Sequence, residues 1–122
     1  QASMPKDVSA FVRKCVQHYS QAQITFLKND YQNLFARIRR TETQVKTEIL
    51  GAINLVFAEQ QQVYRNGAWE IRYCCYPLYS ENEGRCYVLR FNSALVVVTM
   101  FPLGRKTLAK YRKRFIGRGG IG

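Results

Sequence analysis

The chain has 122 residues, of which 47% are hydrophobic and 13% aromatic, and its 19 Lys and Arg against eight Asp and Glu give a formal net charge of +11. A chain of this length and apolar content forms a single domain (1–122) with its own core, which excludes a wholly disordered protein. Eight carboxylates and one histidine, spread along the chain, leave little material for a two-metal site or a carboxylate dyad. A polyanionic partner is expected: RNA, DNA or an anionic membrane surface.

The N-terminal residues and the apolar runs bear on membrane insertion and processing. The longest apolar run, residues 94–98, is far too short for a transmembrane helix, so we expect no membrane span. The first four residues contain neither the basic nor the apolar region of a secretory signal peptide. Because the chain begins with Gln1, we expect either a natural start at Met4 or a piece cut from a longer protein.

Four cysteines, Cys15, Cys74, Cys75 and Cys86, lack the C-x-x-C spacing of zinc and thioredoxin-like sites. If Cys74 and Cys75 lie in a strand, they point to opposite faces, which disfavours a compact disulfide framework. We therefore expect free, partly buried thiols in a reducing compartment. The alternative is a bridge from Cys86 to Cys74 or Cys75 across neighbouring strands. No metal site and no cofactor are expected.

The first half of the chain, about residues 5–62, has the apolar spacing of amphipathic helices. Apolar residues three and four apart predict one helix after Pro5 and a second over 24–38. A third helix is predicted to begin at a capping box formed by Thr41 and Gln44, to continue through Phe57 and to end in polar residues. The pattern leaves open whether the second and third helices form one rod.

At residues 66–67 the apolar period changes from 3.6 to 2, which is typical of strands. Three strands are predicted, about 69–76, 85–91 and 95–101, and the turns between them are too short to join parallel neighbours. The last of these strands is apolar on both faces, which predicts a central, doubly covered position.

A C-terminal helix, about residues 105–115, is predicted after Pro102 and Gly104, and the tail beyond 117 is expected to be flexible. The predicted fold is α+β: N-terminal helices packed on a small antiparallel β-sheet, a meander, with a C-terminal basic helix.

The positive charge is concentrated at the C-terminus. Residues 105–118 contain seven Lys and Arg, and no acidic residue follows Glu83, whereas residues 1–104 carry only +4 from twelve basic and eight acidic residues. Uncompensated like charges cost stability unless a polyanion binds them, although any single one of these residues can belong to an ordinary solvated face. The segment has too few apolar residues for a membrane-surface helix, so nucleic acid is favoured.

Arginines on the predicted strands support the same interpretation. Arg72, Arg85 and Arg90 sit in strands, where a guanidinium fork is held well enough for bidentate phosphate binding. Tyrosines alternate with them, and exposed tyrosine faces beside arginines suit stacked bases of single-stranded RNA. For any single tyrosine, ordinary sheet packing is the alternative.

Four segments together resemble the RelE/HigB-like toxin ribonucleases: residues 66–72 (NGAWEIR), 84–89 (GRCYVL), the apolar 95–98, and the basic step 104–107 before the closing helix. In that family a G-x-W-E-x-R strand, an R-x-x-x-L strand, an apolar strand and a Lys/Arg-rich segment follow one another. More broadly, residues 45–115 resemble the barnase, EndoU, colicin and RelE-like fold, which includes C-terminal RNase domains of polymorphic and contact-dependent toxins. The helices that precede the matched residues, and residues 99–103, are more similar to the delivered toxins. The chain could belong to the toxin–antitoxin members or to the delivered toxins, and the sequence leaves both alternatives open.

The resemblance implies a bacterial toxin that acts as a metal-independent endoribonuclease on tRNA or mRNA. The 2′-hydroxyl would attack the phosphodiester and leave a 2′,3′-cyclic phosphate or its hydrolysed form. The protein would act in the bacterial cytoplasm, either as a toxin with an antitoxin or as the C-terminal domain of a larger secreted protein. Its basic face would be covered by an acidic antitoxin or immunity protein.

The resemblance also implies roles for particular residues. Arg72 and Arg90, which fall on the same face if their strands pair in the simple register, would bind the phosphate. Thr99 would hydrogen-bond a phosphate oxygen, and Tyr111 is a candidate for proton transfer. His18 is either a further catalytic group or a histidine at the edge of a helix packing face. The residues expected to hold the RNA are Arg65, Arg85, Arg105, Lys106, Lys110, Lys113 and Arg114.

Two functions without catalysis also fit the high positive charge. One is a non-catalytic RNA- or DNA-binding module, which would bind with a steep salt dependence and cut nothing. The other is an interaction domain whose basic face docks an acidic protein.

Overall fold

The computed structural model describes residues 7–27, 31–80 and 82–110. Three α-helices precede strand β2 (Leu55–Arg65): α1 (Val8–Val16), α2 (Tyr31–Ile38) and α3 (Glu42–Gly51). Asp7 caps α1 by accepting a hydrogen bond from the Ala10 amide at 3.1 Å. The predicted capping box of α3 is confirmed, because Thr41 Oγ1 accepts from the Gln44 amide and Gln44 Oε1 accepts from the Thr41 amide.

Five strands form one sheet in the order β1-β5-β4-β3-β2. The strands are β1 (Ile24–Phe26), β2 (Leu55–Arg65), β3 (Ala68–Ser80), β4 (Glu83–Phe91) and β5 (Leu95–Pro102). The predicted antiparallel meander is confirmed in β3, β4 and β5, and β2 adds to it antiparallel. The short β1 pairs with β5 in parallel, so the sheet is mixed.

Two of the predicted helices are shorter than expected. The third ends at Gly51, because Ala52 takes a left-handed conformation with φ of 49° that stops the helix, and residues 55–65 form β2. Glu and Gln at 59–62 favour a helix locally, but each of these residues is paired in register with β3. The second predicted helix begins only at Tyr31, because the residues before it form a 3-10 turn (Gln21–Gln23) and β1.

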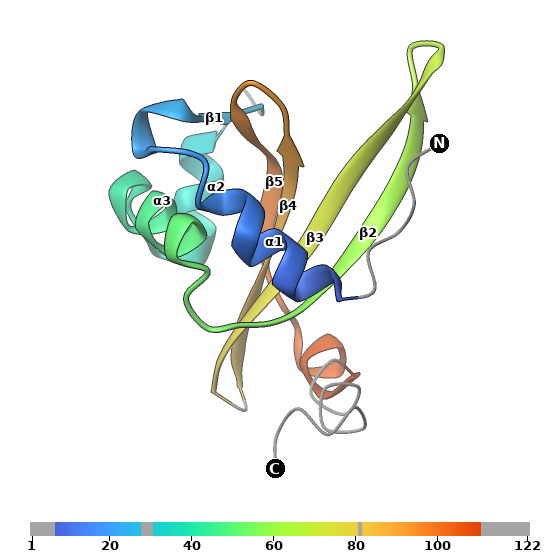
Figure 1. The fold of residues 1–122 in the computed structure, drawn as a ribbon. Helices are drawn as coiled ribbons and strands as arrows, with labels where there is room; N and C mark the ends of the chain where they lie inside the picture. Colours follow the sequence, from blue (N-terminus) through green and yellow to red (C-terminus); the bar gives the residue numbers. More distant parts are fainter. Residues whose placement is uncertain (1–6, 28–30, 81, 111–122) are drawn as a thin grey trace.

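The helices cover one face of the sheet (Figure 1). Val12 of α1, Phe35 of α2 and Ile49 of α3 pack with residues of that face such as Tyr87 and Leu89 in the main core cluster. A second buried cluster, which includes Cys74 and Val88, lies on the opposite face of the sheet. We call this the open face, because none of α1, α2 and α3 covers it. Strand β5 is buried on both faces, as predicted.

The cysteines follow the expected pattern. All four are free, which confirms the predicted thiols. Cys75 belongs to the helix-covered cluster and Cys74 to the cluster on the open face, so these neighbours point in opposite directions.

The sheet forks at one end. The register of β3 with β4 begins at Tyr73 and Leu89, and residues 68–72 pair only with β2. The β2–β3 hairpin therefore stands away from β4 and β5, as Figure 1 shows. Its turn uses Asn66 and Gly67, both with positive φ (51° and 80°), which is the backbone of a two-residue hairpin turn.

The opposite end of the sheet carries the predicted C-terminal helix, which is described over residues 105–110. The Leu103 amide donates to the Gly84 carbonyl at 2.9 Å, and buried Leu108 packs on Gly84. A Cβ at Gly84 would lie 2.6 Å from Leu108 Cδ2, so a larger residue there would force the leucine side chains packed on this glycine to shift. The helix start is thereby fixed at the end of the sheet remote from the fork.

Candidate active site

An open groove with about 1070 Å³ of empty space, part of it open to solvent, lies at the fork of the sheet. Its walls come from α1, from the outer part of the β2–β3 hairpin and from the end of β4. The groove is lined by Phe11, Cys15, Arg65, Ala68, Trp69, Glu70, Ile71, Tyr73, Arg90, Phe91 and Asn92. Because β3 and β4 have stopped pairing here, side chains rather than backbone bonds connect the two strands.

Glu70 makes that connection. Its Oε2 accepts a hydrogen bond from Arg72 Nε and its Oε1 accepts one from Arg90 Nη1, each at 2.5 Å. All three side chains are mostly buried. The prediction that Arg72 and Arg90 share a face is confirmed, since Cys74 pairs with Val88 and each arginine lies two residues further along its strand. A carboxylate is thus held between two guanidinium groups.

The two arginines also determine the charge state of Glu70. The hydrogen bond from Arg72 is the largest influence and lowers the pKa of Glu70, and Arg90 acts in the same direction against the effect of burial. The carboxylate is therefore ionised at neutral pH and has free lone pairs with which to accept a proton.

Arg72 has a hydrogen-bond donor that is not used in the triad of Glu70, Arg72 and Arg90. While its Nε bonds to Glu70, its Nη2 is buried and has no hydrogen-bond partner. A buried donor without a partner is costly, and such groups in proteins are usually matched by an acceptor.

Aromatic side chains lie on the helix-covered side of the hairpin, opposite the face that carries the triad of Glu70, Arg72 and Arg90, because residues alternate between the two faces along a strand. Trp69 is 68% exposed and Tyr64 60% exposed, and their rings meet edge to face with centroids 5.3 Å apart. Deeper in the groove, Tyr73 packs between Phe11 and Phe91 at 5.4 and 5.3 Å. Desolvation raises the pKa of Tyr73, so its hydroxyl stays protonated. The exposed pair offers flat surface to a ligand, whereas the inner rings are structural.

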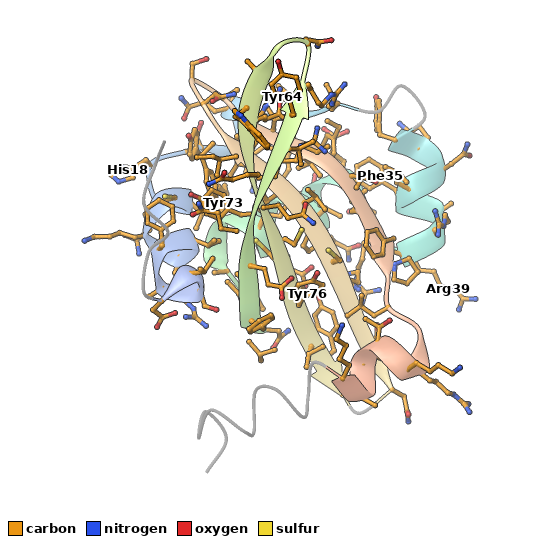
Figure 2. The ribbon with its side chains drawn as sticks, turned by 90° about the vertical axis from the view of Figure 1, so that its right-hand side faces the viewer. His18, Phe35, Arg39, Tyr64, Tyr73 and Tyr76 are labelled. Atoms are coloured by element: carbon orange, nitrogen blue, oxygen red, sulfur yellow. The ribbon has the colours of Figure 1, made fainter. Side chains whose placement is uncertain are left out.

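The other predicted residues of the first half and the sheet lie in different places. Arg65 is exposed and lines the groove. Thr99 is half-buried opposite Val88, one strand beyond β4 and about 13 Å further along the sheet than Glu70, so it does not meet the carboxylate. His18 is exposed and points away from the sheet and from Tyr73 in Figure 2.

Arg85 does not belong to an exposed basic surface. It is only 3% exposed, its Nη2 donates to both oxygens of Glu48 at 2.9 Å, and its Nε donates to Tyr87 at 3.1 Å. Its guanidinium lies 4.2 Å from the ring centre of Tyr79, and both tyrosine hydroxyls donate to Glu48. This is a closed, fully paired cluster that fastens α3 to the sheet, with no group left for RNA.

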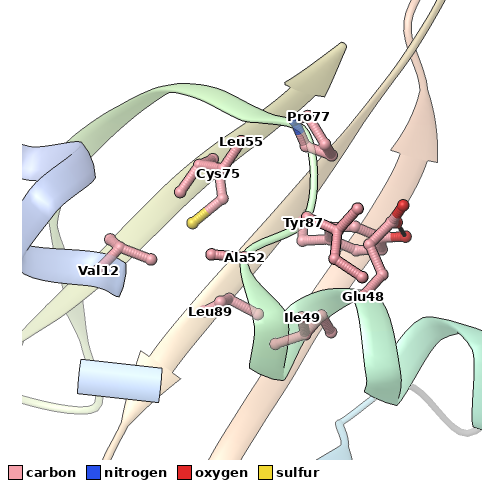
Figure 3. A pocket seen from close by; sticks show the side chains of 10 residues that line it. Val12, Glu48, Ile49, Ala52, Leu55, Cys75, Pro77, Tyr87 and Leu89 are labelled. Carbon is pink, nitrogen blue, oxygen red and sulfur yellow. Dashed lines mark hydrogen bonds between the residues drawn. The ribbon is translucent and has the colours of Figure 1, made fainter. Parts of the chain in front are cut away.

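A small cavity of about 20 Å³ lies beside that cluster, between α1, α3 and the sheet (Figure 3). Its wall is almost entirely apolar, with Val12, Ile49 and Leu55 among its residues, and Glu48 and Tyr87 bond to each other at its edge. The cavity offers a ligand few polar groups, which argues against a catalytic role.

The basic residues of the C-terminal helix are far from the groove. Arg105, Lys106 and Lys110 are exposed at the end of the sheet where Arg85 pairs with Pro102. Arg85 and Arg90 are five residues apart on β4, which separates the two ends by about 17 Å. The expected single site is therefore divided into two regions. Tyr111, Lys113 and Arg114 lie outside the described residues.

Three further observations bear on function. Within 7–27, 31–80 and 82–110, no three His, Cys, Asp or Glu side chains converge in a way that could hold a metal ion. No helix in that part of the chain is long and apolar enough to cross a membrane. Comparisons with protein-family models, curated proteins and solved structures found no match.

Glu70 was not among the predicted site residues, although its spacing from Arg72 in the sequence indicates that the two share a face. Glu70 and Arg72 are two residues apart in a strand and so point to the same face. The link from Glu70 to Arg90 is not local, because it spans 20 positions of the chain and depends on the register of β3 with β4.

Proposed function

We propose that the protein is a metal-independent endoribonuclease whose active site is the groove at the fork of the sheet. The observation that carries the proposal is the ionised Glu70 carboxylate held between Arg72 and Arg90, with a buried, unpartnered Arg72 donor beside it. A proton acceptor next to two cations is what cleavage by a neighbouring hydroxyl requires.

Each group has a definite role in this reaction. Glu70 takes the proton of the ribose 2′-hydroxyl as that oxygen attacks phosphorus, and Arg72 and Arg90 stabilise the added negative charge on the phosphorane oxygens. The bond to the 5′-oxygen then breaks and leaves a 2′,3′-cyclic phosphate. The leaving 5′-oxygen takes a proton from water. The resemblance to RelE/HigB-like ribonucleases names Tyr111 for proton transfer, but this residue lies outside the described part of the chain and directly follows Lys110, which is exposed at the opposite end of the sheet.

The groove favours single-stranded RNA. Trp69 and Tyr64 are exposed at its rim, and exposed rings stack on unpaired bases, by about 1–3 kcal/mol per base. Arg65, which also lines the groove, can reach a neighbouring phosphate. In the bacterial cytoplasm such an enzyme would inhibit growth by cutting tRNA or mRNA, and an acidic antitoxin or immunity protein would neutralise it, as the resemblance implies.

The first prediction tests the chemistry in vitro. Purified protein incubated with single-stranded RNA in excess EDTA should yield fragments ending in 2′,3′-cyclic phosphate, resolved by gel electrophoresis and mass spectrometry. Glu70→Gln should lower the cleavage rate by about 10²–10⁴-fold, because the amide cannot accept the proton. Arg72→Ala should also slow cleavage by removing a phosphate ligand.

The matched control is Glu42→Gln, which removes a carboxylate from the exposed side of α3, remote from the groove. It should cut RNA at the wild-type rate. Intact RNA with the wild-type protein, or full activity of Glu70→Gln, would contradict the proposal.

The second candidate function is a non-catalytic RNA- or DNA-binding module. It is supported by the exposed Trp69 and Tyr64 pair, which can stack bases without any reaction. The same incubation separates the two functions, since a binding module would retain RNA in a salt-dependent manner and release it uncut. An oligonucleotide lacking the single 2′-hydroxyl at the cleaved position should bind the enzyme and remain whole.

A further inference from the structure

A second basic region lies at the end of the sheet opposite the groove. Arg40 at the end of α2 reaches Glu83 at the start of β4, with Arg40 Nη2 3.7 Å from Glu83 Oε2. Glu83 is followed by Gly84, on which Leu108 of the C-terminal helix packs. These contacts bring two basic segments, separated in sequence, to one end of the molecule. We call this region the distal basic end, and its described members are Arg39, Arg40, Arg105, Lys106 and Lys110.

The side chains of the distal basic end face solvent. Arg105, Lys106 and Lys110 are exposed, and Arg39 points away from the protein in Figure 2. Arg39 and Arg40 line an open groove of about 850 Å³ between the end of α2 and the start of α3. Long, charged side chains predominate here, which suits a hydrated polyanion better than an apolar protein partner.

Little negative charge balances this region. Arg105 and Lys106 have no ion-pair partner in the described part of the chain, and Glu83, besides facing Arg40, is also near Arg85 at 3.8 Å. Arg39 likewise has no ion-pair partner among the described residues, so at least three cations of the region are not balanced by a described carboxylate. By contrast, the two arginines of the triad already share Glu70.

The distance between the groove and the distal basic end sets the minimum length of an RNA that can reach both. The ends of β4 at Arg85 and Arg90 are about 17 Å apart, and successive phosphates of a duplex strand are about 3.4 Å apart along the axis. An RNA held in the groove needs roughly five more nucleotides, as a helical strand, before its phosphates reach the distal basic end.

We infer that the distal basic end is a second RNA-binding site, which binds the phosphate backbone of the same molecule whose unpaired segment occupies the groove. This inference rests on the proposed function. The preferred substrate is then an RNA that continues well beyond the cut position, such as a stem with an unpaired loop, rather than a short oligonucleotide. Phosphate contacts at the distal end supply affinity and orientation, and the groove supplies the chemistry.

The second prediction tests the inference by binding rather than by cleavage. In the Glu70→Gln background, fluorescence anisotropy would follow a labelled single-stranded RNA of about 20 nucleotides and a labelled trinucleotide over a series of salt concentrations. For the long RNA, the double variant Arg105→Ala/Lys106→Ala should reduce the slope of the logarithm of the binding constant against the logarithm of the salt concentration by about 1.4. Each phosphate that is no longer neutralised contributes about 0.7 to this change. The trinucleotide, which cannot span both sites, should bind the variant unchanged.

The matched control is Lys14→Ala, which removes an exposed lysine from α1 and should leave both slopes as they were. Thermal unfolding would check that the double variant keeps its fold. An unchanged slope for the long RNA, or equal effects on the long RNA and the trinucleotide, would overturn the inference. Because Glu70→Gln is used throughout, these outcomes are independent of whether the wild-type protein cuts RNA.

Discussion

At the scale of single residues, two charged clusters in the same sheet have opposite characters. Glu70 lies in an open groove between two arginines and leaves an Arg72 donor unpaired. Glu48 is enclosed, and Arg85, Tyr79 and Tyr87 all donate hydrogen bonds to it. Complete pairing indicates a structural role, and incomplete pairing beside open space indicates a ligand.

The third prediction concerns the stability contributed by the enclosed cluster. Glu48→Gln should lower the free energy of unfolding by about 3–5 kcal/mol, because it removes the carboxylate that bonds to buried Arg85 at 2.9 Å and leaves only the longer contact with the more exposed Glu83 at 3.8 Å. Urea denaturation followed by circular dichroism would measure the change. Glu42→Gln on the same helix breaks only the exposed pair with Lys46 and should cost less than about 1 kcal/mol. Equal changes in both variants would show that the cluster is not a main contributor to stability.

The fourth prediction concerns alkaline pH. Burial raises the pKa of both Tyr79 and Tyr87, and the hydrogen bonds to Glu48 raise them further. Below about pH 10 both phenols are neutral in the folded and the unfolded chain, so their contribution is complete. Above about pH 10 only the unfolded chain releases these protons, and the stability should fall as the pH rises.

Tyr87→Phe gives the comparison for this pH dependence, since other tyrosines titrate too. Its free energy of unfolding, measured between about pH 8 and 11, should fall less steeply with pH than that of the wild type. Parallel curves for the two proteins would refute the assignment to Tyr87.

At the scale of elements, the β2–β3 hairpin connects the fold to the proposed chemistry. Its inner half pairs with β4 and forms the sheet, while its outer half stands free and carries Trp69 and Glu70. The edge-to-face contact of Tyr64 and Trp69 links the two strands of the free half. This part of the hairpin buries little, so its exposed rings are available to a ligand.

The fifth prediction follows from this exposure. Trp69→Ala should weaken the binding of single-stranded RNA by about 1–3 kcal/mol, roughly 5- to 150-fold, while the midpoint of thermal unfolding changes little. Trp69→Phe, which keeps an aromatic face, should restore most of the affinity. If Trp69→Ala bound RNA as tightly as the wild type, the hairpin would not be a stacking platform.

At the scale of the whole molecule, the described part of the chain has two basic regions proposed to bind RNA and one buried arginine with a structural role. Arg65, Arg72 and Arg90 lie at the fork, the distal basic end holds a second set, and Arg85 is buried in the core. The sequence predicted the α+β class, the meander, the capping box of α3 and the shared face of Arg72 and Arg90. All of these depend on local periodicity or on neighbouring strands, for which short-range rules are sufficient.

Other features were decided only by the tertiary structure. Residues 55–65 contain good helix formers and become a strand because β3 offers a complete ladder of partners. Arg85 and Arg90 occupy opposite faces of β4, and α3 covers the face of Arg85. The sequence thus determined which residues could carry charge and chemistry. The packing decided which were free to use it, because Glu48 of α3 pairs with buried Arg85, whereas Arg90 lies in a groove open to solvent.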